Sequence, residues 1–278
     1  MKKDSKDISK EIKKLVEKAS FSLRYDLKKV ISKAFQNEKQ KLPKQALGWI
    51  LDNAKAAKKG KLALCQDTGL PVLFIEAGKN QKVTYSLVNK IKKEVVRYYK
   101  KSYLRRSMVD PLLRKKPKYD GVACHLHFSP RVKGLKVTLF PKGFGSENKT
   151  QLKMFNPTAS IDQIENFILN CIKQAGPESC PPFFVGVGIG GTSDQALLLA
   201  KKALIDRVDL ANPDKYLDSL EKRIVKKINK LNIGAMGFGG SSTALAVKVK
   251  KGPTHIAGLP VGVNISCHAL RSATVRIK

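Results

Sequence analysis

Three cysteines, each set in a short turn-rich motif, carry most of the chemistry that this chain can offer. Cys65 opens the sequence CQDTG, Cys180 lies in GPESCPP, and Cys267 lies in NISCHALR. If the three thiolates converge, they hold three irons of an iron–sulfur cluster and leave a fourth position free of protein ligands. Such a cluster serves as a Lewis acid rather than as an electron carrier.

The other two cysteines, Cys171 and Cys124, are weaker candidates for metal ligands. Five cysteines is an odd number in a chain of 278 residues, and disulfide frameworks are typical of short secreted domains, so we expect reduced thiols or metal ligands. Cys171 lies in an apolar helical stretch and is expected in the core. Cys124 precedes His125 and His127, which alternate along a predicted strand. They suggest zinc, but no CxxC or HExxH spacing supports a zinc site.

Three glycine-rich segments lie at 141–149, 185–194 and 234–243. Glycines allow a backbone to approach a ligand closely and to present its N–H groups. Segment 185–194, VGVGIGGTSD, resembles a dinucleotide-binding loop but lacks the usual spacing and the acidic residue that should follow. A strand-to-helix turn that admits a carboxylate or a cluster fits better. Close packing of a strand against a helix is the alternative.

Several side chains are candidates for binding a carboxylate. Guanidinium groups bind carboxylates with two hydrogen bonds, which draws attention to Arg105, Arg106 and Arg271. In a chain with 54 basic residues, however, any single arginine by itself indicates only surface charge. His255 stands in THIAGLP, and a lone histidine is more often structural than catalytic.

Size and composition bound the class of protein. A chain of this length with 42% hydrophobic residues can form one large or two small domains with a core. No apolar run of about 18 residues is present, so no transmembrane helix is expected. The charged N-terminus has no apolar stretch of the kind that directs secretion, and a cytoplasmic location is predicted.

The net charge of +32 is extreme. It favours nucleic-acid binding through phosphate neutralisation, yet no basic motif interleaved with aromatic residues is present. Solvated lysine faces and an acidic partner chain explain the charge equally well. Either way, a positive field attracts small anions such as dicarboxylates.

Hydrophobic periodicity predicts an α/β fold of mixed α+β type, in which a helical N-terminal region over 1–60 precedes a mixed sheet flanked by helices. Three helices are expected in the first 60 residues, the third over Ala46 to Lys58. Strands are predicted at 72–76, 122–128, 135–140, 183–189, 244–249 and 261–265, and further helices at 86–99, 161–174, 193–203 and 214–231. No repeat or linker divides the chain, so we expect one domain over 1–278.

Taken together, the cysteine motifs and glycine segments resemble one family, the alpha subunits of two-subunit class I fumarases and L(+)-tartrate dehydratases. The resemblance extends from Cys65 to the C-terminus. The motifs CQDTG, PKGFGSEN, AGPESCPP, GVGIGGTSDQALLLAKKAL, GAMGFGG and HIAGLPVGVNISCHALR occur in the order of the family.

The resemblance implies a [4Fe–4S] cluster bound by Cys65, Cys180 and Cys267, which acts as a Lewis acid on the substrate hydroxyl. It implies catalytic roles for Gln66, Asp67 and His255, with Asp67 supporting proton transfer. It also implies that the substrate, a small dicarboxylate, contacts Gln66, Asp67, Arg105, Gly145 and His255.

The resemblance further implies a separate beta subunit, because the remaining contacts of the family lie in a domain that follows this one. One segment departs from the family: Lys115–Ala123 replaces an Asn-Thr-x-Asp-Asn-Thr-Pro sequence and bears on substrate choice. We expect a hydro-lyase that converts malate to fumarate, with L(+)-tartrate as the second choice of substrate. Rival hypotheses are a basic nucleic-acid-binding protein on an enzyme-like fold and a structural subunit that positions an active partner.

Overall fold

The chain divides into two units, each with its own sheet and core. The computed structural model describes residues 2–105, 107–117, 121–130 and 132–277. The first unit comprises Met1–Arg24, Ala54–Phe144 and Arg271–Lys278, and the second comprises Tyr25–Asn53 and Gly145–Leu270.

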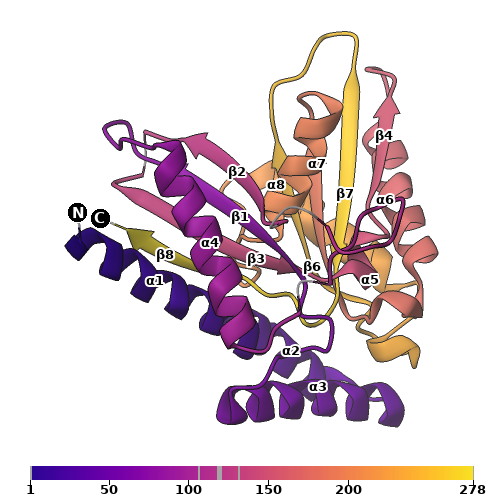
Figure 1. Ribbon diagram of the computed structural model, residues 1–278. Coiled ribbons are helices and arrows are strands. Elements are labelled where there is room, and N and C mark those ends of the chain that lie inside the picture. Colours follow the sequence, from indigo (N-terminus) through magenta and orange to yellow (C-terminus); the bar gives the residue numbers. More distant parts are fainter. Residues whose placement is uncertain (1, 106, 118–120, 131, 278) are drawn as a thin grey trace. The chain divides into compact units, whose positions relative to one another are not determined.

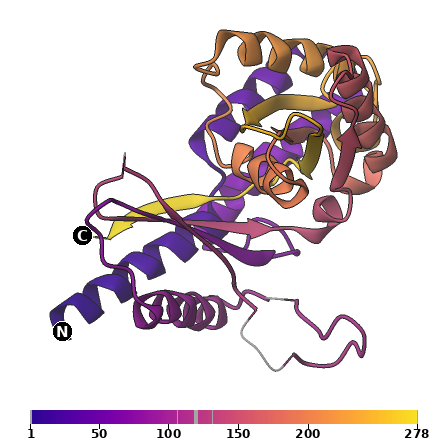
Figure 2. The same cartoon turned by 90° about the horizontal axis from the view of Figure 1, so that it is seen from above.

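The first unit is built on a four-stranded mixed sheet. Its strands are β1 (Leu70–Ala77), β2 (Ala123–Phe128), β3 (Leu135–Lys142) and β8 (Ala273–Ile277), in the order β2-β1-β3-β8. Strands β1 and β2 are parallel, and β3 runs antiparallel to both β1 and β8. Helices α1 (Lys2–Phe21) and α4 (Tyr85–Lys101) lie side by side on one face of this sheet (Figures 1 and 2).

Helical periodicity explains why these two helices form and which sides they bury. Helix α4 buries Ile91, Val95 and Tyr99, which recur every four residues, and Thr84 caps its N-terminus by accepting from the Leu87 N–H. Helix α1 buries the expected set Ile8, Ile12, Leu15, Val16 and Ala19.

The second unit holds another four-stranded mixed sheet, flanked by helices on both faces. Its strands are β4 (Gln151–Phe155), β5 (Phe183–Ile189), β6 (Ala244–Lys251) and β7 (Leu259–Ser266), in the order β4-β7-β5-β6. Its main helices are α6 (Ile161–Ala175), α7 (Ser193–Ala203) and α8 (Lys215–Asn229). Helix α2 (Tyr25–Asn37), the start of α3 (Lys41–Gly60), the short α5 (Phe144–Glu147) and two single turns, η1 (Pro177–Ser179) and η2 (Ala235–Gly237), complete the list of helical elements.

Side-chain alternation along β5 decides which helix lies on which face. Val185 and Val187 belong to the core that also contains the buried residues of α6 and α8. The intervening glycines face α7: a Cβ on Gly186 would lie 2.1 Å from the Ala200 carbonyl oxygen, and one on Gly188 would lie 2.0 Å from the Ala196 carbonyl oxygen. Helix α7 therefore packs directly on the backbone of β5. The close-packing interpretation of these two glycines is confirmed.

The predicted fold class is confirmed, with differences in detail. Each predicted strand and helix is present, but the strands form two mixed sheets rather than one, and β4 and β8 were not predicted. Helix α3 begins at Lys41 rather than Ala46, because Pro43 is tolerated in a first helical turn. The assignment of 1–278 to one family domain stays a prediction. Among the described residues, no helix combines the length and apolar character that a membrane crossing requires.

Candidate active site

The Asp67 carboxylate is held in the first unit by two backbone N–H groups. Its Oδ1 accepts from the Gly69 N–H at 3.0 Å, and its Oδ2 accepts from the Phe144 N–H at 2.7 Å. The CQDTG motif and the segment at 141–149, which are far apart in sequence, therefore meet at this carboxylate. Two N–H donors fix the orientation of this carboxylate.

A buried arginine lies beside the same carboxylate. Arg271 is only 3% exposed. A Cβ built on Gly143 would lie 3.2 Å from Asp67 Oδ2 and 3.6 Å from Arg271 Nη2, so both charged groups border this glycine. The absence of a side chain at position 143 leaves room for them.

Tyr99 completes this cluster from helix α4. Burial raises the pKa of the Tyr99 phenol well above its usual range, the charge of Arg271 opposes that shift, and the charge of Asp67 adds to it. Within the described part of the chain, the Tyr99 hydroxyl and the Arg271 Nε have no hydrogen-bond partner although both are buried. No sequence signal distinguished Tyr99, because its spacing in α4 is that of an ordinary core residue.

Arg105 contacts the backbone of the CQDTG motif, while the substrate contacts expected of Gln66, Asp67 and Arg105 stay predictions. Its Nη2 donates to the Gln66 backbone carbonyl at 2.5 Å, and its own carbonyl accepts from the Thr68 hydroxyl. The Arg105 and Gln66 side chains are exposed and Asp67 is half-buried. The first unit thus brings Gln66, Asp67 and Arg105 together. Arg106, also named as a candidate clamp, lies outside the described residues.

Cys180 and the residue that follows Cys267 are in direct contact in the second unit. Cys180 has a left-handed backbone (φ 54°) and follows the single turn η1. Its carbonyl oxygen accepts from the His268 N–H at 3.3 Å and lies 3.1 Å from His268 Nδ1. The two cysteine motifs are therefore neighbours although Cys180 and Cys267 are 87 positions apart in the sequence.

Gly145 lies beside the Cys180 motif. Its carbonyl accepts from the Ser179 hydroxyl at 3.1 Å, and a Cβ on Gly145 would meet no atom within 4 Å. The next residues are anchored: the Glu147 carboxylate accepts from Asn264 Nδ2 of β7 at 2.8 Å and from Lys201 of α7. This anchoring fixes Gly145 while leaving open space on its side-chain position.

The third glycine segment packs on the same motif. The Met236 N–H donates to the Pro181 carbonyl at 2.8 Å, and a Cβ on Gly237 would lie 2.5 Å from the Pro177 Cβ. Gly237 also has a left-handed backbone (φ 81°), which disfavours any other residue. Segment 234–243 thus supports the turn that presents Cys180.

The thiols differ in environment. None of the five cysteines forms a disulfide, and Cys65, Cys180 and Cys267 are partly exposed. Cys171 is fully buried in the core, as predicted, and burial raises the pKa of its thiol to about 12. Burial also raises the pKa of the Cys124 thiol, although nearby Lys92 opposes the shift. Because metal ligands must be thiolates, buried Cys171 is the poorest of these candidates.

The convergence of the three cysteines stays a prediction. Cys65 belongs to the first unit, whereas Cys180 and Cys267 belong to the second. Over the described ranges, no three side chains of His, Cys, Asp or Glu are grouped so as to hold a single metal ion. The partial exposure of the three thiols and the contact between the Cys180 and Cys267 motifs nevertheless fit a cluster ligand set.

His255 lies at the other end of strand β7 from Cys267. It precedes β7 in an exposed turn, where the Ala257 N–H donates to its Nδ1 at 3.1 Å. Cys267 directly follows the eight residues of β7. At about 3.3 Å per residue, this strand separates the two residues by roughly 26 Å (Figure 1). The structure therefore does not bring His255 to Cys267, and its predicted substrate contact stays a prediction.

The turn at Gly190 and Gly191 lies at that same far end of the sheet. The Gly190 N–H donates to the Pro260 carbonyl at 2.9 Å, close to the start of β7. Cys180, by contrast, precedes β5 and lies at the opposite end. The length of β5 therefore separates this turn from Cys180, and the expectation that the turn admits a carboxylate or a cluster stays a prediction. The first glycines of segment 185–194 serve packing against α7.

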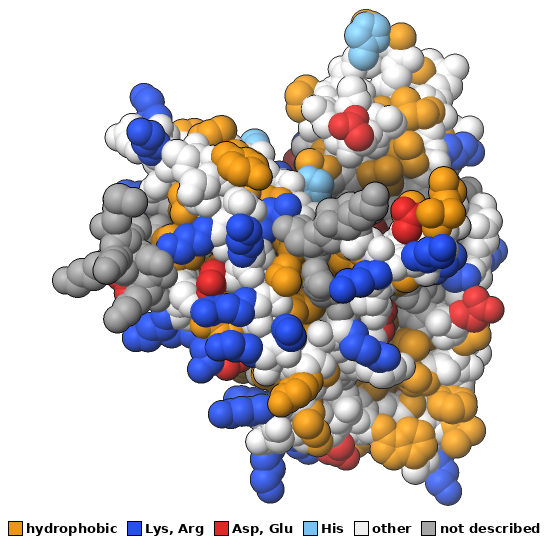
Figure 3. Space-filling view, in the orientation of Figure 1, with side chains coloured by type: hydrophobic (Ala, Val, Ile, Leu, Met, Phe, Trp, Pro, Cys, Tyr) orange, Lys and Arg blue, Asp and Glu red, His pale blue; other side chains and the backbone are white. Residues whose placement is uncertain are grey.

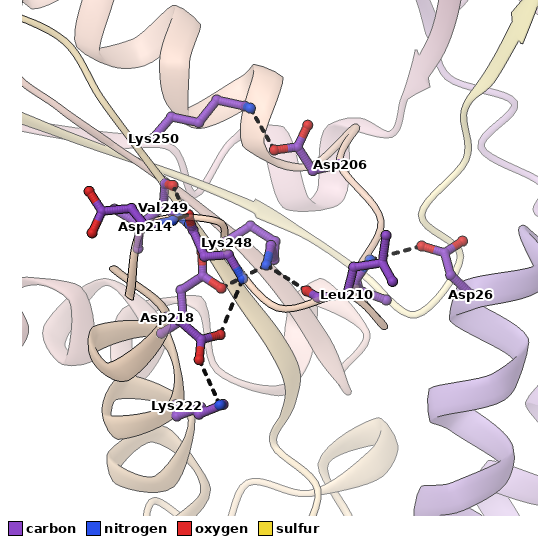
Figure 4. Close-up of polar contacts among 12 residues, drawn as sticks. Asp26, Asp206, Leu210, Asp214, Asp218, Lys222, Lys248, Val249 and Lys250 are labelled. Atoms are coloured by element: carbon purple, nitrogen blue, oxygen red, sulfur yellow. Dashed lines mark hydrogen bonds and ion pairs between the residues drawn. The ribbon is translucent and has the colours of Figure 1, made fainter. Parts of the chain in front are cut away.

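A second polar cluster in the second unit joins the α7–α8 connection to β6 (Figure 4). Lys248 is buried and donates to Glu221 at 2.7 Å and to the Leu210 carbonyl at 3.1 Å. Lys250 pairs with Asp206 at 2.5 Å. A cavity of about 550 Å³ adjoins these residues. Since opposite charges are paired throughout, we interpret this cluster as a structural clasp.

Comparison with known proteins identifies relatives over nearly the whole chain. The sequence model of the family described as fumarate hydratase (Fumerase) matches residues 9–276. A Methanocaldococcus jannaschii protein provisionally named as an L(+)-tartrate dehydratase subunit alpha is 40% identical over 280 residues, with 98% of each chain covered. A Geobacillus stearothermophilus protein provisionally named as a class I fumarate hydratase is 34% identical over 95% of this chain and 53% of its own length. The L(+)-tartrate dehydratase subunit alpha of Escherichia coli K12 is 25% identical over 82% of this chain and 77% of its own length.

Proposed function

Because the chain belongs to the fumarate hydratase (Fumerase) family, we propose that it is the alpha subunit of an iron–sulfur-dependent enzyme that interconverts malate and fumarate. Its family and the names of its relatives make it a hydro-lyase. The observation that carries the finer proposal is the Asp67 carboxylate held between two N–H groups beside Gln66, Arg105 and the cysteine of CQDTG.

Cys65, Cys180 and Cys267 would hold a [4Fe–4S] cluster. When bound, such a cluster supplies Lewis acidity toward the hydroxyl group of the substrate. The support from this chain is that the three thiols form no disulfide and are partly exposed, and that the Cys180 and Cys267 motifs are in contact.

The other residues would bind the substrate and move a proton. Arg105 donates from Nη2 to the Gln66 carbonyl, and the other N–H groups of its exposed guanidinium would bind a carboxylate of the substrate. Asp67 would support removal of the proton from the carbon next to the hydroxyl-bearing carbon, because its orientation is fixed before substrate arrives. Gly145 would admit the substrate, since its side-chain position is open.

L(+)-tartrate is the second candidate substrate. The relative at 40% identity, which matches over 98% of both chains, carries the name of a tartrate dehydratase alpha subunit. Tartrate differs from malate by one hydroxyl group, so the same carboxylate and hydroxyl contacts would serve both acids. The word alpha in that name also supports the proposal of a separate beta subunit as partner.

The test is to co-express the chain with its proposed beta subunit, purify the complex without oxygen, and measure iron, acid-labile sulfide and turnover of both acids. We expect about four irons per heterodimer and release of water from malate. A complex that contains the cluster but turns over only tartrate would identify L(+)-tartrate, the second candidate, as the substrate.

A pair of variants tests the ligand assignment. Cys180→Ala should lose iron and sulfide, whereas Cys124→Ala, which changes a half-buried thiol of β2, should retain both. Equal iron content in the two variants would contradict the assignment. Nucleic-acid affinity that falls steeply with salt, in a preparation that never takes up iron, would instead favour the binding-protein hypothesis.

A further inference from the structure

A cavity of about 620 Å³ lies in the first unit, beside but distinct from the residues assigned above. The loop 107–114, helix α4 and the starts of β1 and β2 form its walls. Its apolar lining includes Met108, Val109, Val122 and Phe144, and its cationic lining consists of Lys92 and Arg114. We call it the Arg114 pocket.

The Arg114 pocket adjoins the Asp67 carboxylate. Phe144 lines the pocket, and its N–H donates to Asp67 Oδ2 at 2.7 Å. Leu70 lines the pocket as well and directly follows Gly69, whose N–H donates to Asp67 Oδ1 at 3.0 Å. One N–H group that binds Asp67 thus belongs to a lining residue, Phe144, and the other belongs to Gly69, which precedes the lining residue Leu70. The pocket and the Asp67 carboxylate therefore share one wall, formed by Phe144 and the Gly69–Leu70 segment.

The loop that carries Arg114 is fixed by Asp110. The Asp110 carboxylate accepts from the Leu112 N–H at 3.0 Å and the Leu113 N–H at 2.8 Å. Its backbone accepts from the Arg114 N–H at 3.0 Å and donates to the Lys115 carbonyl at 2.7 Å. These bonds close the turn and hold the backbone from which the exposed Arg114 side chain extends.

Two residues that line the pocket have unfavourable backbone conformations. Ser107 (φ 50°) and Arg114 (φ 56°) are left-handed although neither is glycine. Strain of this kind clusters at ligand clamps. Gly121 is also left-handed, and a Cβ there would lie 1.4 Å from the Met108 methyl carbon. The lysine-rich segment that departs from the family ends at this wall, and its final glycine is what allows Met108 to fill it.

The cationic and apolar residues that line the pocket favour an organic anion as its ligand. None of the described residues that line the pocket is acidic, and two are cationic. The field of the first unit acts in the same direction: it carries 33 Lys and Arg against 9 Asp and Glu, compared with 21 against 13 in the second unit. Figure 3 shows this excess of basic side chains over α1 and α4.

We propose that the Arg114 pocket is the specificity pocket of the hydro-lyase, and that it accepts dicarboxylates bearing an alkyl substituent. Arg114 and Lys92 bind the carboxylate remote from the hydroxyl group, and Met108, Val109 and Val122 contact the substituent. Cavities of this size hold ligands larger than an unsubstituted four-carbon acid. The inference rests on the proposed function for the reaction, but the binding it predicts does not require turnover.

The first experiment measures binding to the full chain by calorimetry, with succinate and 2-methylsuccinate as unreactive probes. We expect 2-methylsuccinate to bind at least as tightly as succinate, and Arg114→Gln to weaken both by about tenfold or more, as for loss of a charge-assisted hydrogen bond. Arg97→Gln is the matched control, since Arg97 is exposed on α4 and pairs with Glu94. Equal affinity in wild type and Arg114→Gln would overturn the proposal.

The second experiment measures turnover by the complex with malate and 3-methylmalate. Met108→Trp should fill the wall, lowering kcat/KM for 3-methylmalate by about tenfold or more relative to malate. An unchanged ratio of the two kcat/KM values would overturn the role of the wall. Binding that depends on Arg114 in a protein with no turnover of any hydroxy acid would sink the proposed function and leave the pocket standing. Turnover that does not depend on Arg114 would leave the proposed function standing and overturn the pocket proposal.

Discussion

Replacement of Gly188 by alanine separates two interpretations of the glycine-rich segment 185–194. The added Cβ would lie 2.0 Å from the Ala196 carbonyl oxygen, 2.6 Å from the Ala200 nitrogen and 2.8 Å from the Leu199 Cβ. Favourable contacts between heavy atoms need about 3.5 Å. Helix α7 would therefore have to move away from β5 by more than about 1 Å, and the atoms in the way are mostly backbone, which cannot rotate aside.

The size of the effect follows from that displacement. Overpacking of a close-packed interior costs roughly 1–3 kcal/mol, and the rigid obstacles here place Gly188→Ala near about 3 kcal/mol. For a chain of this length, each kcal/mol lowers Tm by roughly 2–4 °C, which gives a decrease of about 6–12 °C. Gly252→Ala is the matched control, because its Cβ would meet only Leu199 Cδ1 at an ordinary 3.4 Å.

Thermal unfolding followed by circular dichroism gives the answer. We expect Gly188→Ala to melt well below wild type and Gly252→Ala to melt close to it. If Gly188→Ala kept the wild-type Tm and lost affinity for an anion instead, the glycine would serve a ligand, and the packing argument would be refuted. An equal decrease in both variants would also refute it.

Three further predictions concern the site and its support. Arg271→Met should lower kcat roughly tenfold to a hundredfold by releasing Asp67 from its position; steady-state kinetics should show partial recovery in Arg271→Lys. Burial acts to raise the pKa of Glu38, but N–H bonds from Gln40, Ser241 and Lys39 and the Ser241 hydroxyl outweigh it and hold that pKa below its usual value. Its stabilising contribution is therefore present above about pH 4.3, the unfolded value, and is lost as pH falls through the folded pKa. Urea unfolding should show Glu38→Gln weaker than wild type at pH 7 and similar to it near pH 3. If His255 contacts substrate, it must do so in another copy of the chain, so mixing inactive His255→Asn and Cys180→Ala complexes should restore turnover, and no recovery would exclude a shared site.

The sequence was most informative where structure depends on local pattern. The repeat of Ile91, Val95 and Tyr99 defines one side of α4, and Asp214 accepts from the N–H groups at the start of α8 as its position before an amphipathic stretch suggests. Strands with continuous apolar runs, such as β5 and β7, were equally clear. These signals require only neighbouring residues, so no knowledge of the fold is needed to find them.

The two missed strands lie at sheet edges and depend on distant partners. Strand β4 exposes three of its five residues, and β8 alternates exposed and buried positions with an arginine among them. Strand β8 pairs with β3 from the far end of the chain, Leu135 opposite Ile277. An edge strand needs only one neighbour and often carries polar residues. Neither its composition nor its period reveals which strand it joins, and the division into two sheets is hidden for the same reason.

From the sequence we could identify the motifs of the candidate site, but not the residues that pack around these motifs. Gln66, Asp67 and Arg105 were named from the sequence and lie together. Tyr99 was not named, because a buried tyrosine in an amphipathic helix has the pattern of a core residue whatever its hydroxyl faces. Glycines were ambiguous for a related reason: Gly188 and Gly145 look alike in sequence, yet one lies against a helix and the other faces open space. Only the atoms around a glycine distinguish these uses.

Two of the motifs cross the boundary between the units, so the order of motifs along the sequence does not indicate which residues surround Asp67. The segment PKGFGSEN passes from the first unit to the second between Phe144 and Gly145, and NISCHALR returns between Leu270 and Arg271. Phe144 and Arg271, the residues on the first-unit side of these two passages, are the ones that bond or border Asp67. The surroundings of Asp67 are therefore built within one unit, whereas the three cysteines are divided between two. Loss of iron and loss of Asp67 geometry should consequently be separable by mutation, because the two N–H groups that bind the Asp67 carboxylate belong to Gly69 and Phe144 of the first unit.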